Sequence, residues 1–131
     1  MLDLPPNLGS ATVAALTVAD LFVVPVSASG MDLRATDRAL GLMRQARQVR
    51  KDGKPETLLV PSRVDRRTGS GREIEAVLSD FREPVGPAIS QRSAHVDAYS
   101  AGRWIGDYAP RTAPHVEIEA LAAVIKMMVS R

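Results

Sequence analysis

The sequence contains no cysteine among its 131 residues, which excludes disulfide bonds, thiolate metal sites and cysteine nucleophiles. Aromatic residues make up only 4% of the chain, so a core has to be built from aliphatic side chains and methionine. No apolar run approaches the length of about 20 residues that a membrane-spanning helix requires. No basic segment leads into an apolar one at the N-terminus, so we expect no signal peptide and a cytoplasmic location.

The composition is that of a globular protein. Hydrophobic residues make up 45% of the chain and charged residues 24%, a balance that permits a packed core and argues against a disordered chain. The length suits one domain and is too short for two ordinary ones, so we expect a single domain over residues 1–131. A net charge of +2 and an isoelectric point near 9.4 leave the surface mildly basic, which permits contact with nucleic acid.

Short apolar runs alternate with longer segments of helical periodicity. Leu21–Val26 is continuous and rich in valine, as is typical of a strand buried on both faces, and Glu56–Ser62 contains a second such run. Val85–Ser90 is a weaker third candidate, because Gly86 and Pro87 interrupt it. The spacing of apolar residues predicts helices over Asn7–Val18, Asp32–Lys51, Arg72–Phe81 and Pro114–Val129, with Val49 and Val116 among the inward-facing residues.

This order of strands and helices predicts an α/β fold, a parallel sheet flanked by helices on both faces. In such a sheet, ligands bind beyond the carboxyl ends of the strands. The loops in which chemistry should be sought are therefore Asp3–Ser10, Ser27–Asp32, Arg63–Arg72 and Gln91–Ala94.

The first of these loops has an unusual composition. An apolar stretch ends in Asp3, and Pro5, Pro6 and Gly9 then lead into the first expected helix. Many phosphate-transfer ATPases place a carboxylate near Mg²⁺ in this way, whereas the simpler alternative is an acid favoured by the helix dipole. The phosphate loop with which such a carboxylate works, G-x-x-x-x-G-K-[ST], occurs nowhere in the chain.

Several segments in order resemble the ParA/MinD group of P-loop ATPases, in particular the ParA-type partition proteins. Asp3–Gly9 resembles their acidic Asp-x-Pro-Pro motif, and Ala19–Val26 resembles the strand that follows it. Leu59–Thr68 resembles a later strand with its Asn-Arg-x-Asp-like loop. The C-terminal region of the family is matched by Ile89–Gly102, Tyr108-Ala109-Pro110 and the helix that contains Glu117. The resemblance covers essentially the whole chain.

The resemblance implies a P-loop NTPase-like fold that is incomplete at the N-terminus. It also implies a cytoplasmic, nucleoid-associated protein that segregates plasmids or chromosomes, or positions other cargo. Such proteins bind ATP with Mg²⁺, form nucleotide sandwich dimers and bind DNA non-specifically. A centromere-binding, ParB-like partner stimulates their hydrolysis of ATP to ADP and phosphate. We see no basic amphipathic C-terminal tail that would point to a membrane-positioning role.

The resemblance assigns roles to individual residues. Asp3 would be the catalytic carboxylate and would hold Mg²⁺ through water. A second group of residues would contact the nucleotide, namely Pro5, Pro6, Ser62, Arg63 and Asp65. At the position of Ser62 the family often has Asn. The candidates for contact with the DNA backbone are Arg66, Arg67, Arg72 and Arg92. Without the resemblance, these residues would be interpreted as solvated loops and surface arginines.

The missing phosphate loop leaves three hypotheses. In the first, the chain is the C-terminal portion of a ParA-type ATPase and hydrolyses ATP negligibly alone, because most phosphate-neutralising groups are absent. In the second, it is a non-enzymatic regulator that binds DNA or poisons a full-length ParA-like chain by dimerising with it. In the third, Met1 is an internal methionine of a longer gene, and the loss of early strands exposes a sheet edge and apolar faces.

Overall fold

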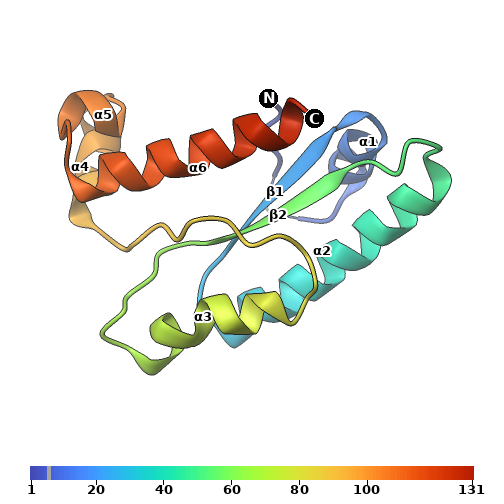
Figure 1. The fold of residues 1–131 in the computed structure, drawn as a ribbon, viewed down its shortest axis with the longest axis horizontal. Helices are drawn as coiled ribbons and strands as arrows, with labels where there is room; N and C mark the ends of the chain where they lie inside the picture. Colours follow the sequence, from blue (N-terminus) through green and yellow to red (C-terminus); the bar gives the residue numbers. More distant parts are fainter. Residues whose placement is uncertain (6) are drawn as a thin grey trace.

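Two parallel strands lie at the centre of the computed structural model, which describes residues 1–5 and 7–131 (Figure 1). β1 (Leu21–Val26) pairs with β2 (Glu56–Pro61) in a register that places Leu21 opposite Glu56 and Val26 opposite Pro61. Both strands were predicted from their apolar runs, and β2 ends one residue before the expected boundary at Ser62. The parallel direction is the one that the strand–helix order predicts.

A third extended segment runs along the other side of β2. Isolated parallel bridges join Leu59 to Val85 and Val64 to Ser90. The backbone N–H of Gly86 donates to Leu59 O at 2.8 Å, which makes β2 the central member of three hydrogen-bonded segments. The predicted strand Val85–Ser90 is therefore present only as an irregular ladder, because proline cannot donate to it.

Helices cover both faces of this parallel core. α1 (Ser10–Val18), α2 (Gly30–Val49) and α3 (Gly69–Ser79) supply Leu16, Leu40, Met43, Ile74 and Leu78 to one buried cluster. α6 (Ala113–Val129) covers the opposite face, where its Met128 packs with Leu58 and Val60 of β2 (Figure 1). The predicted α/β fold with helices on both faces is thus confirmed.

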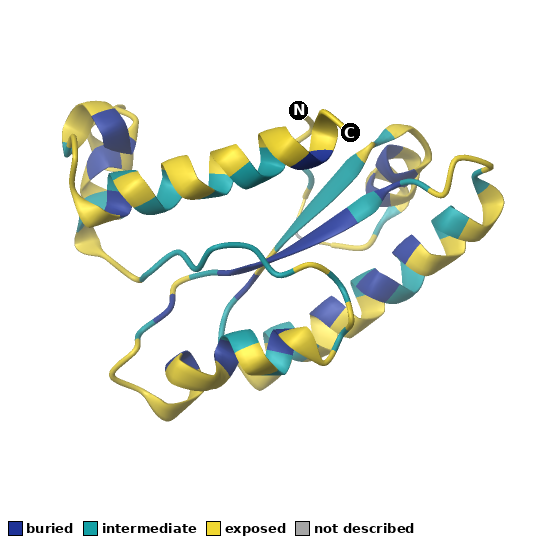
Figure 2. Cartoon of the chain, viewed as in Figure 1, coloured by how far each residue is buried: buried dark blue, intermediate teal, exposed yellow. Residues whose placement is uncertain are grey.

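Two short helices, α4 (Ser93–Ser100) and α5 (Ile105–Tyr108), precede α6 and were not expected from the sequence. They stack against the N-terminal end of α6, at the left of Figure 1. Their burial is slight, as the mostly exposed colouring of this corner in Figure 2 shows. The chain therefore reaches its last core helix through a largely solvent-exposed excursion.

Side-chain caps move two helix starts toward the N-terminus of the expected boundaries. The Ser29 hydroxyl accepts a hydrogen bond from Asp32 N at 3.1 Å and starts α2 at Gly30. The Thr68 hydroxyl accepts one from Gly71 N at 3.0 Å and starts α3 at Gly69 rather than Arg72.

Among the described residues, none of the helices combines the length and the apolar character that a membrane span requires.

Two of the predicted inward-facing residues are wrong. Val49 at the end of α2 is 85% exposed, and Val116 in the first turn of α6 is 55% exposed. Val49 lies on the opposite side of α2 from the buried Leu40, and in the first turn of α6 the buried Pro114 and half-buried Glu117 mark a face that Val116 does not share. Helical spacing located the helices, but not every apolar residue in them lies on the face that meets the core.

Candidate functional site

The carboxyl ends of the three parallel segments are joined by backbone hydrogen bonds. Ser62 N, just past β2, donates to Val26 O at the end of β1 at 2.9 Å. Val64 N donates to Ile89 O at 3.0 Å, and Gln91 N donates back to Val64 O at 2.9 Å. The loops after β1, after β2 and after the third segment therefore begin at one edge, where ligands bind in parallel α/β sheets.

The loop after β2 has a fixed conformation. Arg63 is a non-glycine residue with a φ of 54°, in the left-handed region that L-residues adopt at some cost. Asp65 next accepts hydrogen bonds from Arg67 N at 3.0 Å and from Arg67 Nε at 2.8 Å. The Arg67 guanidinium, with help from the Arg67 backbone N–H, lowers the pKa of the Asp65 carboxyl to about 2. This side chain is therefore ionised across the physiological range.

Gly71 holds this loop against the start of α3. A Cβ at this position would lie 2.0 Å from Asp65 O, a distance that no real contact permits. The neighbouring Gly69 has nothing within 4 Å of the position of its Cβ. Close packing against the backbone of Asp65 therefore requires glycine at position 71 and not at position 69, and Gly71 sets the path of the loop.

The four arginines predicted to bind DNA do not behave alike. Arg66 forms an ion pair with Glu75 at 2.5 Å, and Arg67 forms one with Asp65 at 2.7 Å. Arg72 donates to the backbone O of Arg67 at 3.1 Å, so these three side chains are grouped at the start of α3. Arg92 follows the third segment and pairs with a different helix, α6.

Glu117 on α6 is the anchor for that segment. Its carboxylate accepts hydrogen bonds from Ser90 N at 3.0 Å, from Ser90 Oγ at 2.9 Å and from Arg92 Nη2 at 3.1 Å. Burial alone would raise the pKa of Glu117, but these hydrogen bonds outweigh it and hold the pKa below its ordinary value. Sequence reasoning noted the helix that contains Glu117 and missed this role, because the partners are 27 residues apart.

Asp3 stands apart from this constellation. It is exposed, and among the residues that the structure describes it forms no hydrogen bond or ion pair, with Ser62, Arg63 or Asp65 or with any other residue. Pro5 is exposed and Pro6 lies outside the described residues. α1 then begins at Ser10, with Gly9 as its N-cap. The predicted roles of these residues therefore stay predictions.

The described side chains offer few protein ligands for Mg²⁺. Across residues 1–5 and 7–131, no group of three or more His, Asp or Glu side chains is placed to hold a metal ion. Mg²⁺ commonly uses one or two carboxylates together with water and substrate phosphates, and a single carboxylate such as Asp3 is compatible with that mode. The residues present thus fit an ion brought by a nucleotide and do not fit a protein cage.

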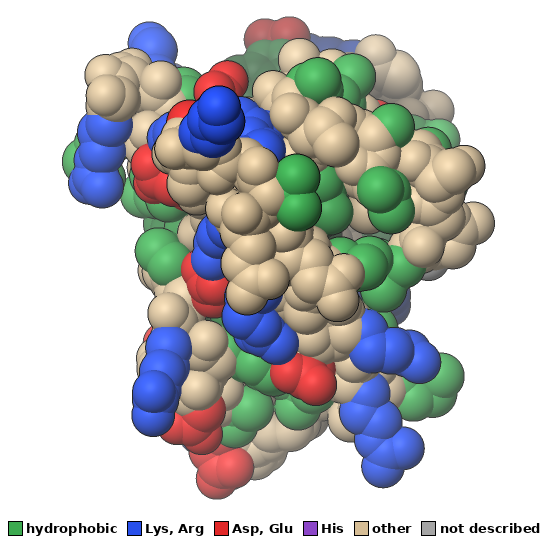
Figure 3. All heavy atoms as spheres, turned by 90° about the vertical axis from the view of Figure 1, so that its right-hand side faces the viewer, with side chains coloured by type: hydrophobic (Ala, Val, Ile, Leu, Met, Phe, Trp, Pro, Cys, Tyr) green, Lys and Arg blue, Asp and Glu red, His purple; other side chains and the backbone are tan. Residues whose placement is uncertain are grey.

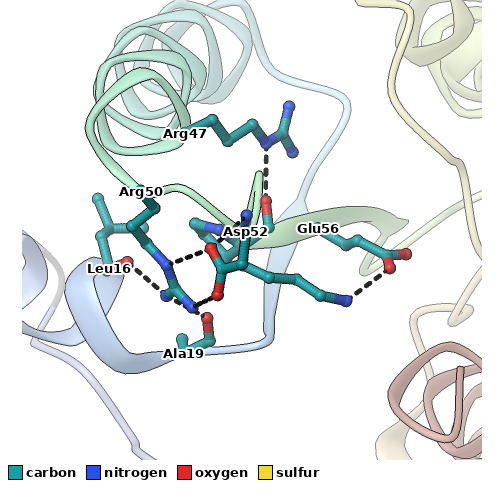
Figure 4. A network of polar contacts seen from close by, with 8 residues as sticks. Leu16, Ala19, Arg47, Arg50, Asp52 and Glu56 are labelled. Atoms are coloured by element: carbon teal, nitrogen blue, oxygen red, sulfur yellow. Dashed lines mark hydrogen bonds and ion pairs between the residues drawn. The ribbon is translucent and has the colours of Figure 1, made fainter.

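A separate polar network fixes α1 at the opposite end of the sheet (Figure 4). Arg50 Nη1 donates to Leu16 O at 3.2 Å and to Ala19 O at 2.7 Å, which satisfies carbonyls at the C-terminal end of α1. Asp52 holds the guanidinium through two further hydrogen bonds, and this pairing lowers the pKa of Asp52 to about 2. The helix that follows the Asp3–Ser10 loop is therefore tied to the end of α2.

No protein-family model matches the chain. Over 115 residues it is 32% identical to the sporulation initiation inhibitor protein Soj of Bacillus subtilis (strain 168), a ParA-family ATPase. This similarity supports a relationship between the chain and the ParA/MinD-type ATPases. The aligned residues make up 86% of the chain and 45% of Soj, so the chain spans less than half the length of this relative. The resemblance of its motifs and its parallel α/β fold are consistent with that relationship.

Proposed function

We propose that residues 1–131 form one ParA-like unit that serves DNA segregation or cargo positioning as part of a ParA-type ATPase. The similarity to Soj over 86% of the chain carries this proposal. The parallel edge, where the Ser62–Thr68 loop meets the Ile89–Arg92 segment, supports it because this is the ligand-binding end of such a sheet. We place the protein in the cytoplasm, at the nucleoid, with a ParB-like partner and with a second ParA-like chain as dimer partner.

In this function the arginines at the carboxyl edge bind the DNA backbone. Arg66, Arg67 and Arg92 each lie against a carboxylate, and the Arg67 side chain is 89% exposed. The pairs of Arg66 and Arg67 are exposed, and such pairs contribute about 0–1 kcal/mol, so phosphate groups can replace these two carboxylates at little cost. The pairs would then hold the guanidinium groups in place and be exchanged when DNA arrives.

Binding of a fluorescent DNA duplex of arbitrary sequence, measured by anisotropy at two salt concentrations, tests this part of the proposal. Four phosphate contacts would weaken binding roughly 150-fold between 50 and 200 mM salt, because each contact releases a counterion. Arg67→Ala should lower the salt slope by about one contact. Arg38→Ala, which removes an exposed arginine of α2 away from these loops, is the control. Absence of binding at 50 mM salt would refute the DNA-binding role.

In the nucleotide part of the proposal, Asp3 holds Mg²⁺ through water, and Ser62, Arg63 and Asp65 lie near the base or the facing subunit. The chain contains no phosphate loop, so we expect it to hydrolyse ATP negligibly by itself. A thermal melt with and without millimolar Mg-ATP, combined with a phosphate-release assay, checks this. Mg²⁺-dependent turnover that Asp3→Ala abolishes would overturn the expectation. A rise in the melting midpoint without turnover would mean that the nucleotide binds without being hydrolysed.

A further inference from the structure

The exposed aromatic residues of the chain are gathered in the corner formed by α4 and α5. Tyr99, Trp104 and Tyr108 are its only two tyrosines and its only tryptophan, and they are 87%, 50% and 39% exposed. The two phenylalanines, in contrast, pack against the buried cluster of α1, α2 and α3. Figure 2 shows how much of this corner faces solvent, and Figure 3 shows further apolar patches between charged groups on another side of the molecule. Exposed apolar side chains that lie together mark interaction sites more often than cores.

A single helical turn brings Trp104 and two of its neighbours to one side of α5. The backbone N–H groups of Asp107 and Tyr108 both donate to Trp104 O, at 3.1 and 3.0 Å. The two residues between them, Ile105 and Gly106, are buried, and the other three are exposed. Two aromatic rings and a carboxylate are therefore presented together on the solvent side of this turn.

The indole ring of Trp104 is held in place although half of it is exposed. A Cβ at Gly106 would lie 1.8 Å from this ring, so the indole occupies space that only glycine leaves open. The ring of His115 on α6 meets it edge-to-face, with centroids 5.1 Å apart and an angle of 87° between the planes. His115 is fixed in turn, because its Nδ1 accepts a hydrogen bond from Arg111 N at 3.0 Å. A rigid aromatic surface binds a partner at a low cost in conformational entropy.

The charge of this corner is opposite to that of the chain as a whole. Residues 93–119 have a net charge of −2 with histidine neutral, whereas the whole chain has +2. Within residues 1–5 and 7–131, the carboxylates of Asp97 and Asp107 form no hydrogen bond or ion pair, and Arg103 reaches only the backbone O of Asp107. Free carboxylates and the negative faces of aromatic rings both attract a cation.

We propose that Trp104, Asp107 and Tyr108 form a docking site for a basic peptide, in which an arginine side chain of the partner stacks on the indole and pairs with the carboxylate. Arginine suits the site better than lysine, because its planar guanidinium stacks on aromatic faces and pairs with carboxylates through two hydrogen bonds. Tryptophan and tyrosine are also residue types on which the binding energy of protein interfaces concentrates. None of the arginines proposed to bind DNA belongs to this set, so the inference goes beyond the proposed function and stands if that function fails.

The fluorescence of Trp104 tests the site directly, because this residue is the only tryptophan of the chain. The chain is titrated with a short peptide in which arginine alternates with serine, and with lysine–serine and glutamate–serine peptides of the same length. We expect a saturable change in emission with the arginine peptide, roughly two- to fivefold weaker binding of the lysine peptide, and no change with the glutamate peptide.

Substitutions separate stacking from charge, with binding of a fluorescein-labelled arginine peptide measured by anisotropy. Trp104→Leu should weaken binding roughly two- to fivefold, and Trp104→Phe, which keeps an aromatic face, should recover much of this loss. Asp107→Asn should weaken binding by a similar factor. Asp37→Asn makes the same change in net charge at an exposed position of α2 and should leave binding unchanged. Because the fluorescence titration uses the unmodified chain, it still decides the question if a variant fails to fold.

Four results would overturn the inference. Equal binding of the arginine and lysine peptides would leave only a non-specific attraction between charges. Emission of Trp104 that changes with the concentration of the chain alone would identify a second copy as the occupant. A single-stranded oligonucleotide that changes the emission as much as the arginine peptide does would identify bases as the groups that stack on the indole. No response to the arginine peptide would exclude the docking site altogether.

Discussion

The two ends of the sheet use the same chemistry in different surroundings. At the amino end, Arg47 of α2 pairs with Glu83 at 2.8 Å, and the two side chains are only 26% and 12% exposed. At the carboxyl end, the pair between Arg67 and Asp65 has a similar length of 2.7 Å, but Arg67 is 89% exposed. The two ion pairs therefore have similar lengths and differ in how far solvent reaches their side chains.

The difference in solvent exposure decides what each pair can do. Arg47 also donates to Pro55 O at 2.7 Å and to the hydroxyl of Thr57, so it joins α2 to β2 and to the segment that contains Glu83. Removing one partner of a desolvated pair leaves a charge without compensation. An exposed pair loses little when water or another anion replaces the carboxylate. The amino end is thus built to hold elements together, and the carboxyl end to exchange partners.

Arg47→Ala should have the largest effect. Loss of a buried pair costs about 3–5 kcal/mol, and we expect about 2–3 kcal/mol here because Arg47 stays partly solvated. Urea denaturation of the variant and of Arg44→Ala, an exposed arginine one turn earlier on α2, measures the difference. Equal stability of the two variants would contradict the statement that the ion pair at the amino end holds elements together.

Gly71→Ala should follow. The added methyl group would meet Asp65 O, and overpacking of this kind costs about 1–3 kcal/mol. It should also weaken DNA binding, because the Asp65–Thr68 loop that places Arg66 and Arg67 has to move. Gly69→Ala, at a position with open space, is the control and should be neutral or slightly stabilising. Thermal melts and DNA anisotropy of both variants check this, and a harmless Gly71→Ala would contradict the packing.

Glu117→Gln should have a smaller, pH-dependent effect. The pKa of Glu117 is lowered in the folded state, so its contribution to stability is present above its ordinary pKa and lost as the pH falls through the lowered value. At pH 7 we expect a loss of about 1–2 kcal/mol, because one of the two accepting oxygens becomes an amide nitrogen, which cannot accept the hydrogen bond made there. The same variant of the exposed Glu119 should keep the wild-type pH profile of unfolding between pH 3 and 6.

Glu75→Gln should have the smallest effect and act in the opposite direction. It releases Arg66 from an exposed ion pair and should raise DNA affinity about two- to fourfold over a matched charge change. Glu73→Gln supplies that match, since Glu73 lies two residues away on α3 and forms no ion pair in the part of the chain described here. Identical affinities for the two variants would show that Arg66 does not take part.

The strands were predictable from sequence because their signal is local. Leu21–Val26 and the run around Leu58 are continuous, apolar and short, and the order of elements then requires a parallel sheet. α4 and α5, with eight and four residues, escaped prediction because such short helices carry almost no periodic signal. The irregular third segment was correctly suspected, since Gly86 and Pro87 weaken a strand without preventing its carbonyls from accepting hydrogen bonds.

The candidate site was predictable only as a set of loops. Sequence placed Ser62, Arg63 and Asp65 after a strand and Arg92 after another, and hydrogen bonds through Val64 join these loops. It could not select the carboxylate that each arginine meets. Glu117 reaches Ser90 across 27 positions because α6 packs along the sheet, and no local pattern encodes that distance.

By itself, the sequence determined the strands, the helical stripes, the α/β class and the residue types in each loop, because side-chain spacing and turn chemistry act over a few positions. Only the tertiary structure decided which charges are desolvated, which apolar helix residues stay exposed and which edge of the sheet is left unpaired among the described residues. Those properties depend on how elements far apart in the chain pack, and β1 shows it most clearly. Its side chains are those of an interior strand, but packing places it at the edge of the sheet, where, within residues 1–5 and 7–131, no backbone group pairs with its outer side.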